Sequence, residues 1–548
     1  MSLRNRLVLP IVLSSLAVLA GCGSSNTITN PVAPPNGSFS NSNLNGTYVF
    51  SVSGVDNATS APYTIVGAFT ANGSGGNGQG GISGGTIDLN DPGVSTPVAN
   101  ASINSSSYSV EVDGRGKATL STSLPAPFGT IVLDFVLQDS SHGLVTEFDS
   151  NGSGSGTLDV QTSGVSPVGT YAFIFSGFDI STGTANLFST VGNFTLGTGG
   201  TISTGLEDFN DNGFGYPAQG LTGQVVLGPS ASPATTLITQ LGSQIGAETY
   251  DVYAISATHL KFIEMDTAGT LSGDAYSQTS TAVPQGNLAF TLAGSYPGVT
   301  TYSAAGGFMV TDGQGNITDS STEDANNSGT VTASPTGFSG NYVAGGVGRF
   351  TLDLASFSAG SAYAAYPSSG GLLLLEIDNG LGLMTGVAYP PQTSTTFNGS
   401  AGYGLNFTGA NLTQGVEVDD IAEFASSSTG LTVTGIVDEN WAPGGSPNYG
   451  LALSGTYTTP DGNGRGMIGA TAGTSSNTTL NGGFDISFYS VDGTTYPFIE
   501  TDTNDLQVTA GVFFTQDASA SAAAAATRPH MFAVRPLIRP NAAHWRKK

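Results

Sequence analysis

Residues 46–54 read GTYVFSVSG, and three later stretches of the chain repeat this pattern. The repeats are GTYAFIFSG at 169–177, GNLAFTLAG at 286–294 and AGYGLNFTG at 401–409, so successive copies start 123, 117 and 115 residues apart. A period above about 100 residues indicates a duplicated domain, because solenoid repeats recur every ~20 to 50 residues. The sequence therefore predicts four tandem modules.

Within each module the side chains alternate with a period of two. Tyr48, Phe50 and Val52 share one face of the first copy, which is typical of a half-buried antiparallel strand. In the first module we expect eight strands, at 46–54, 64–71, 80–90, 106–112, 116–123, 129–138, 143–149 and 155–161. Eight strands joined in sequence form an up-and-down meander, and closure into a small barrel removes its open edges. The predicted fold class is therefore all-β, with four eight-stranded barrels, and two-sheet β-sandwiches are the alternative.

Cys22 is the only cysteine among the 548 residues, and it follows Leu19-Ala20-Gly21 at the end of an apolar run. This stretch resembles a bacterial lipobox, which implies cleavage before Cys22 and attachment of lipid to it. Residue 23 is Gly rather than Asp, which by the same resemblance favours the outer membrane. The resemblance thus implies an exported protein of the bacterial cell envelope whose partner is the membrane, through the lipid on Cys22.

The repeat and the lipobox together divide the chain into seven segments. We expect a signal peptide at 1–21, a flexible tether at 22–43, modules at 44–163, 164–281, 282–394 and 395–517, and an Ala-rich, then basic, disordered tail at 518–548. The bases of the tail suit either anionic lipid head groups or an acidic protein surface, and the sequence leaves both open.

Acidic and basic residues are concentrated in different parts of the chain. Residues 23–517 hold all 39 acidic residues but only five of the 13 bases, whereas residues 518–548 hold six bases and no acid. An acidic body repels nucleic acid, so no nucleic-acid partner is expected. With its one cysteine taken by lipid, the chain forms no internal disulfide. We expect a monomer.

The Gly-Thr-Tyr start of the modules resembles the Gly-x-Trp start of the first strand in lipocalin and avidin-like barrels. The aromatic here is Tyr48, Tyr171 or Tyr403, the third module has Leu288 instead, and no Arg on a last strand is placed to stack on it. The resemblance covers three residues per module. It favours a barrel and implies no particular ligand.

A Glu-x-Asp pair recurs once per module. The members of this column are Glu147 and Asp149, Glu264 and Asp266, Glu376 and Asp378, and Glu500 and Asp502. Two carboxylates on one strand face lie ~7 Å apart, a separation that inverting glycosidases also use. Catalytic pairs converge from different strands in a single cleft, however, so a fourfold pair favours a structural role. We predict no catalytic residue.

The scarce bases of the body supply one cation to each module. These are Lys117, Lys261, Arg349 and Arg465. Because the acids of the Glu-x-Asp column also occur once per module, we expect an ion pair inside each module between the base and these carboxylates.

An Asp-x-Asn column lies earlier in each module, shortly before a glycine. Its members are Asp88 and Asn90, Asp208, Asn210 and Asn212, Asp324 and Asn326, and Asp438 and Asn440. Alternating oxygen side chains before a glycine resemble the first half of an EF-hand calcium loop, although Gln219 stands where that loop needs a bidentate acid. Calcium is the only cofactor this pattern predicts. Turn formation by Asp and Asn is the alternative.

The sequence contains few residues or motifs suited to other kinds of catalysis or metal binding. His142 and His259 are the only histidines of the body, each five residues before the Glu of its module, and we expect both in hairpin turns. There is no P-loop, no Gly-x-Ser-x-Gly elbow and no cysteine pair. We therefore expect a binding or structural role at the cell envelope, with a glycan, an envelope protein or a small molecule as ligand. A secreted enzyme acting on polysaccharide is the alternative.

Overall fold

The computed structural model describes residues 32–34, 37–75, 78–227, 236–243, 246–296, 302–332, 334–380, 382–473, 483–503 and 506–520. For residues 226–227 and 236–243 it describes the backbone alone. The described residues form 35 strands and one 3-10 helix, η1 (Asn41–Asn43). None of the described helices is long and apolar enough to cross a membrane. Cys22 and the lipobox lie outside the described residues.

Barrel 1 contains nine strands, of which eight form a closed ring. The ring consists of β1 (Asn45–Asp56), β2 (Pro62–Asn72), β3 (Gly80–Asn90), β5 (Ser106–Val110), β6 (Arg115–Ser121), β7 (Thr130–Leu137), β8 (His142–Phe148) and β9 (Gly152–Val160). Each pairs with the next, and β1 pairs with β9 to close the barrel. The ninth strand, β4 (Val98–Ile103), lies on β3 outside the ring, and the sequence did not predict it.

Barrels 2 and 3 repeat this topology. Barrel 2 comprises β10 (Gly169–Asp179), β11 (Asn186–Leu196), β12 (Thr201–Asp211), β13 (Phe214–Gly220), β14 (Thr222–Leu227), β15 (Thr236–Ser243), β16 (Gly246–Ser256), β17 (His259–Glu264) and β18 (Ser272–Ser277). Barrel 3 comprises β19 (Gly286–Ser295), β20 (Ser303–Thr311), β21 (Asn316–Asn327), β22 (Thr330–Val331), β23 (Thr336–Gly346), β24 (Arg349–Ala355), β25 (Ala362–Ser368), β26 (Gly371–Glu376) and β27 (Leu383–Ala388).

Barrel 4 contains only the eight ring strands. They are β28 (Gly402–Asn411), β29 (Val416–Ser427), β30 (Thr432–Ala442), β31 (Asn448–Tyr457), β32 (Arg465–Ala472), β33 (Phe484–Tyr489), β34 (Thr495–Glu500) and β35 (Gln507–Thr515). The predicted all-β fold of tandem eight-stranded barrels is therefore confirmed. The two-sheet sandwich is wrong, since the first and last strands pair in every module.

The period-two pattern places one set of side chains inside each barrel. Tyr48, Phe50 and Val52, the predicted inner face of β1, all belong to the buried core of barrel 1. The interiors of the other barrels are filled in the same way by aromatic and branched aliphatic side chains. Burial of these side chains supplies the main stabilisation of a chain that forms no internal disulfide.

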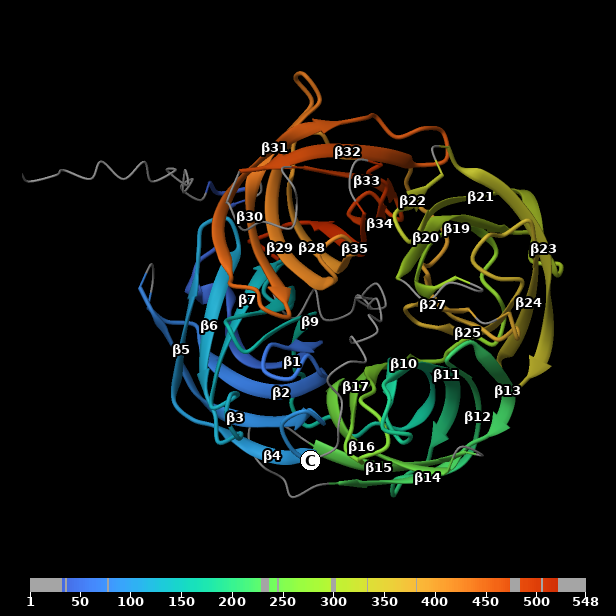
Figure 1. Cartoon of the computed structure of the whole chain (residues 1–548), viewed down its shortest axis with the longest axis horizontal. Coiled ribbons are helices and arrows are strands. Elements are labelled where there is room, and N and C mark those ends of the chain that lie inside the picture. The colour runs from blue at the N-terminus through green and yellow to red at the C-terminus, as the bar shows by residue number, and fades with distance from the viewer. Residues whose placement is uncertain are drawn as a thin grey trace, which may run out of the picture.

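The four barrels form a closed ring (Figure 1). The first three strands of each barrel lie against the last three strands of the next, and β28, β29 and β30 of barrel 4 lie against β7, β8 and β9 of barrel 1. The outward faces of these strands are apolar as well: Val49 and Val66 of barrel 1, for example, pack on Tyr253 and Ile263 of barrel 2. Strands at these boundaries are thus buried on both faces. We call the four boundaries joints 1–2, 2–3, 3–4 and 4–1.

The ends of the described chain meet on barrel 1. Phe39 is buried in its core, and Asn41 is buried and donates to the carbonyl oxygen of Gly78 at 2.6 Å. Asn43 Nδ2 donates to the carbonyl oxygen of Ala518 at 2.9 Å. The predicted tether at 22–43 is therefore wrong at its C-terminal end, because residues 39–43 pack as part of barrel 1.

Candidate functional site

The Asp-x-Asn column forms the joints between barrels. In joint 1–2, Asn90 Nδ2 donates to the carbonyl oxygens of Glu264 and Gly269 at 2.8 and 2.9 Å. The equivalent amides are Asn210 to Glu376 and Gly382, Asn326 to Glu500 and Gln507, and Asn440 to Glu147 and Gly152, all at 2.7 to 3.1 Å. All four amides are buried. The last pair joins barrel 4 to barrel 1, so the ring closes with the same contact that builds it.

The aspartate of the column also reaches the next barrel, in three joints through a tyrosine. The hydroxyl groups of Tyr253, Tyr366 and Tyr489 donate to Asp88, Asp208 and Asp324 at 2.7, 2.5 and 2.8 Å. In joint 4–1 the strand register places Val136 at the tyrosine position. The sequence reasoning missed these tyrosines, although each stands ten or eleven residues before the Glu of a Glu-x-Asp pair.

Arginine neutralises the aspartate in joints 2–3 and 3–4. Arg349 Nη2 and Nε contact Asp208 Oδ1 and Oδ2 at 2.5 and 2.8 Å. Arg465 binds Asp324 in the same bidentate way, with both distances 2.7 Å. The predicted module-internal ion pair is therefore wrong for both arginines. They pair with the Asp-x-Asn column of the preceding barrel, because each arginine lies on the outward face of its strand, in alternation with core residues such as Phe350 and Ile468.

Joint 1–2 brings two carboxyl groups together. Asp251 of barrel 2 and Asp88 of barrel 1 are both buried, and the two carboxyl groups lie near enough for each to shift the pKa of the other. Burial, and then the neighbouring Asp88, raise the pKa of Asp251 to about 7. Two neighbouring carboxyl groups in a buried site repel each other when both are charged, which favours a proton on one of them.

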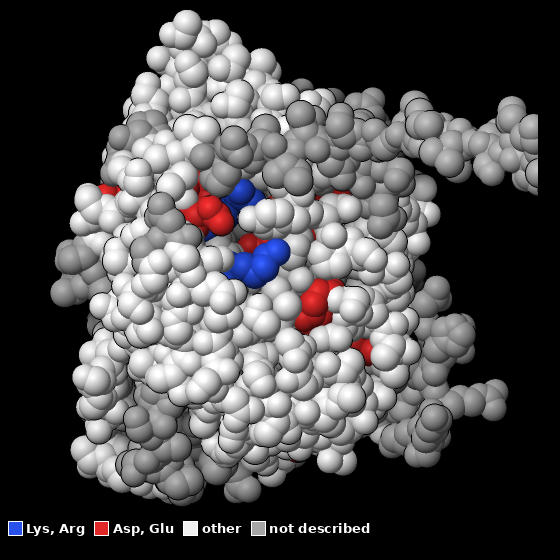
Figure 2. All heavy atoms as spheres, turned by 90° about the vertical axis from the view of Figure 1, so that its left-hand side faces the viewer, with Lys and Arg blue, Asp and Glu red and all other residues white. Residues whose placement is uncertain are grey.

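Joint 4–1 combines a carboxyl pair with bases. Asp134 and Asp438 are both buried, and burial followed by the charge of Asp438 raises the pKa of Asp134. Arg115 Nη1 donates to Asp438 at 2.5 Å, while its Nε donates to Asp113 at 3.0 Å. Figure 2 shows this side of the ring, where basic side chains lie beside acidic ones and most of the surrounding surface is uncharged.

The two lysines of the predicted ion-pair column also have other partners. Lys117 Nζ lies 4.6 Å from the ring centroid of Phe148 and 4.2 Å from that of Tyr449, which belongs to barrel 4. Lys261 Nζ contacts Asp274 at 2.7 Å within barrel 2. The structure therefore brings neither lysine into a salt bridge with its Glu-x-Asp pair.

The glutamates of the Glu-x-Asp column point into the barrels. Glu147 accepts a hydrogen bond from the hydroxyl of Tyr63, and Glu500 accepts one from Thr509 at 2.8 Å. Glu264 and Glu376 accept from the backbone amides of Leu271 and Met384. Burial is the main cause that raises the pKa of Glu147 and Glu264, and it raises that of Glu376 to about 9. Burial thus favours the protonated form of Glu147, Glu264 and Glu376 inside the barrels.

The aspartates of this column fasten a hairpin turn. Asp149 accepts from the backbone amides of Asn151 and Val132, each at 2.7 Å. Asp266 and Asp378 repeat this pattern with two backbone amides each. Asp502 is also largely buried. In the Glu-x-Asp pairs, the glutamate therefore lies in the barrel interior and the aspartate holds the turn, so the two carboxylates do not line a common cleft.

The residues predicted as calcium ligands use their oxygens on protein donors. Asn210 Oδ1 and Asn326 Oδ1 accept from the backbone amides of Gly213 and Gly329, both at 2.9 Å. Asn212 and Gly213 both have positive φ, as a tight two-residue turn requires. The described residues contain no group of three or more His, Cys, Asp or Glu side chains arranged for a metal ion. The alternative interpretation, turn formation, accounts for these two loops.

The two histidines pair with aspartates at the inner side of the ring. His142 Nδ1 lies 2.7 Å from Asp159 Oδ1, and His259 Nε2 lies 2.7 Å from Asp274 Oδ1. His142 is the first cause that lowers the pKa of Asp159, and His259 of barrel 2 lowers it further. His142 begins β8 and His259 begins β17, so both stand at the ends of hairpin turns.

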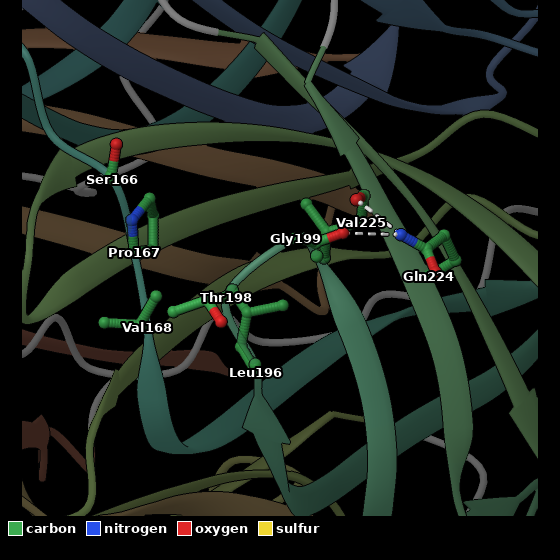
Figure 3. Close-up of a pocket in the computed structure, with 10 residues that line it drawn as sticks. Ser166, Pro167, Val168, Leu196, Thr198, Gly199, Gln224 and Val225 are labelled. Atoms are coloured by element: carbon green, nitrogen blue, oxygen red, sulfur yellow. Dashed lines mark hydrogen bonds between the residues drawn. The ribbon is translucent and has the colours of Figure 1, made fainter.

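Described residues line several cavities, including the following two. One, of 520 Å3, opens at an end of barrel 2, between the chain entering β10 and the Gly-rich turn that follows β11. Figure 3 shows that Val168, Leu196 and Thr198 line it together with Gln224. The other, of 460 Å3, lies where barrels 1, 3 and 4 approach one another.

Comparison with known proteins does not assign this chain to a family. No family model matches the chain, and no curated protein matches it significantly. A crystal structure of a provisional AttH protein from Nitrosomonas europaea is similar over 43% of this chain and 92% of its own, with 10% identity and a TM-score of 0.17. A likeness this low carries no argument about fold or function.

Proposed function

We propose that this chain is an exported, lipid-anchored protein of the bacterial cell envelope, whose ring of barrels serves as a rigid platform for binding or for structure. The observation that carries the proposal is the closure of the ring. Asn440 makes the same two hydrogen bonds to barrel 1 that the other three amides make in their joints. Closure leaves no free end of the array, so the four barrels present a fixed arrangement of repeated surfaces.

The filled barrel interiors support recognition on the outside of the ring. Aromatic and aliphatic side chains fill all four interiors, and each interior also holds a buried glutamate. A small molecule inside a barrel would have to displace this core. Four related outer surfaces suit a repetitive target, because weak contacts at several barrels add through avidity. We therefore favour an envelope glycan or an envelope protein over a small molecule.

The anchoring half of the proposal is tested with Cys22→Ser. In a bacterial host fed with labelled palmitate, the native chain should take up the label and sediment with the outer membrane. The Cys22→Ser chain should be exported without label and stay in the soluble fraction. A native chain that remains unlabelled and soluble contradicts the lipid anchor.

The binding half is tested by sedimentation of the full chain with insoluble envelope polymers. Purified peptidoglycan sacculi and outer-membrane vesicles are mixed with the protein, and the bound fraction is measured as a function of polymer concentration. Saturable binding to either material supports a binding platform. If the protein binds neither material, these ligands are excluded and the structural role remains.

A further inference from the structure

The cavity of 460 Å3 lies on the inner side of the ring, because residues of the opposite barrels 1 and 3 both line it. Barrel 1 contributes Gln138 and His142, barrel 4 contributes Val491, Asp492 and Phe514, and Tyr389 follows the last strand of barrel 3. Its walls are mainly aromatic and aliphatic, with a carboxylate at Asp492, which is exposed.

The described chain ends beside this cavity. After β35 the chain does not leave the ring but follows the turn between β7 and β8 of barrel 1. Asp517 N donates to the carbonyl oxygen of Gln138 at 2.8 Å, and Ser140 Oγ donates to that of Ala520 at 2.6 Å. Gln138 therefore both holds the departing chain and lines the cavity.

The chemistry of the remaining chain matches the cavity. Residues 521–548 contain six bases and no acid, and they include Phe532 and Trp545. Residues 23–520 hold all 39 acidic residues against five bases, and the cavity itself carries the exposed carboxylate of Asp492, so this part of the chain attracts a basic segment over a distance of about 10 Å at moderate salt. Aromatic side chains of the segment suit the walls formed by Tyr389 and Phe514. A segment of 28 residues, at ~3.3 Å per residue, is long enough to enter from Ala520.

We propose that the basic segment 521–548 docks in this cavity and ties barrels 1, 3 and 4 together across the inside of the ring. A tether to Ala520 raises the effective concentration of the segment at the cavity to the millimolar range, so even weak contacts keep it bound. This inference does not depend on the lipid anchor or on any external ligand. The sequence left two partners open for the tail, the acidic body and anionic lipid, and this proposal favours the acidic body.

Hydrogen exchange of the full chain and of a variant that ends at Ala520 tests the proposal. The amides of Thr393 and Val491 are bonded at the cavity, to the carbonyl oxygens of Val491 and Thr495. Truncation should speed their exchange about tenfold or more, since docking stabilises the elements it contacts. Amides beside the barrel 2 cavity, such as that of Val225, are the internal control and should not change.

Adding the segment back as a synthetic peptide makes the test specific. The peptide 521–548 should restore slow exchange in the truncated chain, and a peptide with all six bases replaced by Gln should not. Equal exchange rates in the full and truncated chains overturn the proposal. So does binding of the full chain to phosphatidylglycerol vesicles with no change at Thr393 and Val491, which assigns the segment to lipid.

Discussion

Joints 2–3 and 3–4 differ from joints 1–2 and 4–1 in how they neutralise the same buried aspartate. In the first two, Arg349 and Arg465 each bind one aspartate through two nitrogen atoms. In the other two, carboxyl groups outnumber bases. Asp251 adds a second carboxyl group beside Asp88. Asp134 adds one beside Asp438, which Arg115 binds through one nitrogen. One fold thus accepts either a bidentate charge pair or a second buried carboxyl group beside the same aspartate. Barrel 1 alone is bounded on both sides by joints of the second kind.

Removing the arginine of joint 2–3 should give the largest loss. In Arg349→Met, Asp208 keeps its place in a buried joint without its partner, and breaking a buried pair in this way costs about 3 to 5 kcal/mol. The free energy of unfolding is measured by guanidinium titration followed by circular dichroism.

The control for this substitution removes both charges. The double variant Asp208→Asn with Arg349→Met leaves no unpaired charge, so it should be more stable than Arg349→Met alone. Equal stability of the single and double variants would show that Asp208 without its arginine does not destabilise the protein as an unpaired buried charge. The distinction between the two kinds of joint would then fail.

Opening the ring at joint 4–1 should cost somewhat less. Asn440→Ala removes two hydrogen bonds and leaves the carbonyl oxygens of Glu147 and Gly152 without them, at a cost of about 2 to 4 kcal/mol. The equivalent variant Asn210→Ala in joint 2–3 is the matched comparison. Barrels 2 and 3 are also linked by the chain between β18 and β19, whereas barrels 4 and 1 are not consecutive in the chain, so only Asn440→Ala should expand the molecule in small-angle X-ray scattering. Equal expansion of both variants contradicts this ranking of the joints.

The fold was predictable because its evidence is local and repeated. The period-two pattern around Tyr48, Phe50 and Val52 and the recurrence of the whole module indicated barrels without any knowledge of contacts between modules. Strand β4 was missed because it lies outside the ring, where neither barrel closure nor the repeat required it. The outward apolar residues, such as Val49, were the overlooked sign that the barrels also pack on one another.

The joints could be predicted only in part. Comparing the modules located the columns of Asp, Asn, Glu and base, but it cannot show which module each column faces. Arg349 was therefore assigned to Glu376 of its own module, whereas it binds Asp208 of the preceding one. The Asn210 loop looked like half a calcium loop because a turn that ends in glycine uses the same residue types.

The carboxyl joints should make the protein less stable as pH rises. The pKa of Asp251 is raised to about 7 in the folded chain from 3.8 when unfolded, so the folded state binds more protons between these values. The stability that goes with the raised pKa of Asp251 is complete below about pH 4 and is lost as pH rises through 7. Asp88 and Asp134, whose pKa values are also raised, act in the same direction.

Replacing Asp251 by Asn separates this effect from the rest. The amide of Asn can donate to Asp88 at any pH, so Asp251→Asn should flatten the fall of the thermal midpoint between pH 5 and pH 8. Asp353→Asn, at an exposed position of β24, is the control and should leave the slope unchanged. If Asp251→Asn does not reduce the slope of the thermal midpoint against pH, the protons are bound elsewhere, for example on the buried glutamates inside the barrels.

The smallest effect should come from Lys117, and it bears on whether joint 4–1 belongs with the carboxyl joints despite its bases. Lys117 Nζ lies over Phe148 of barrel 1 and Tyr449 of barrel 4, so Lys117→Gln should cost about 0.5 to 1 kcal/mol through the lost cation–π contacts. The charge of Lys117 also lowers the pKa of Asp134. Its removal should therefore leave Asp134 protonated to higher pH and make the fall of stability with pH steeper, while Lys117→Arg should preserve the native slope. A loss as large as that of Arg349→Met, with an unchanged slope, would mean instead that Lys117 neutralises an acid directly and that joint 4–1 resembles the arginine joints.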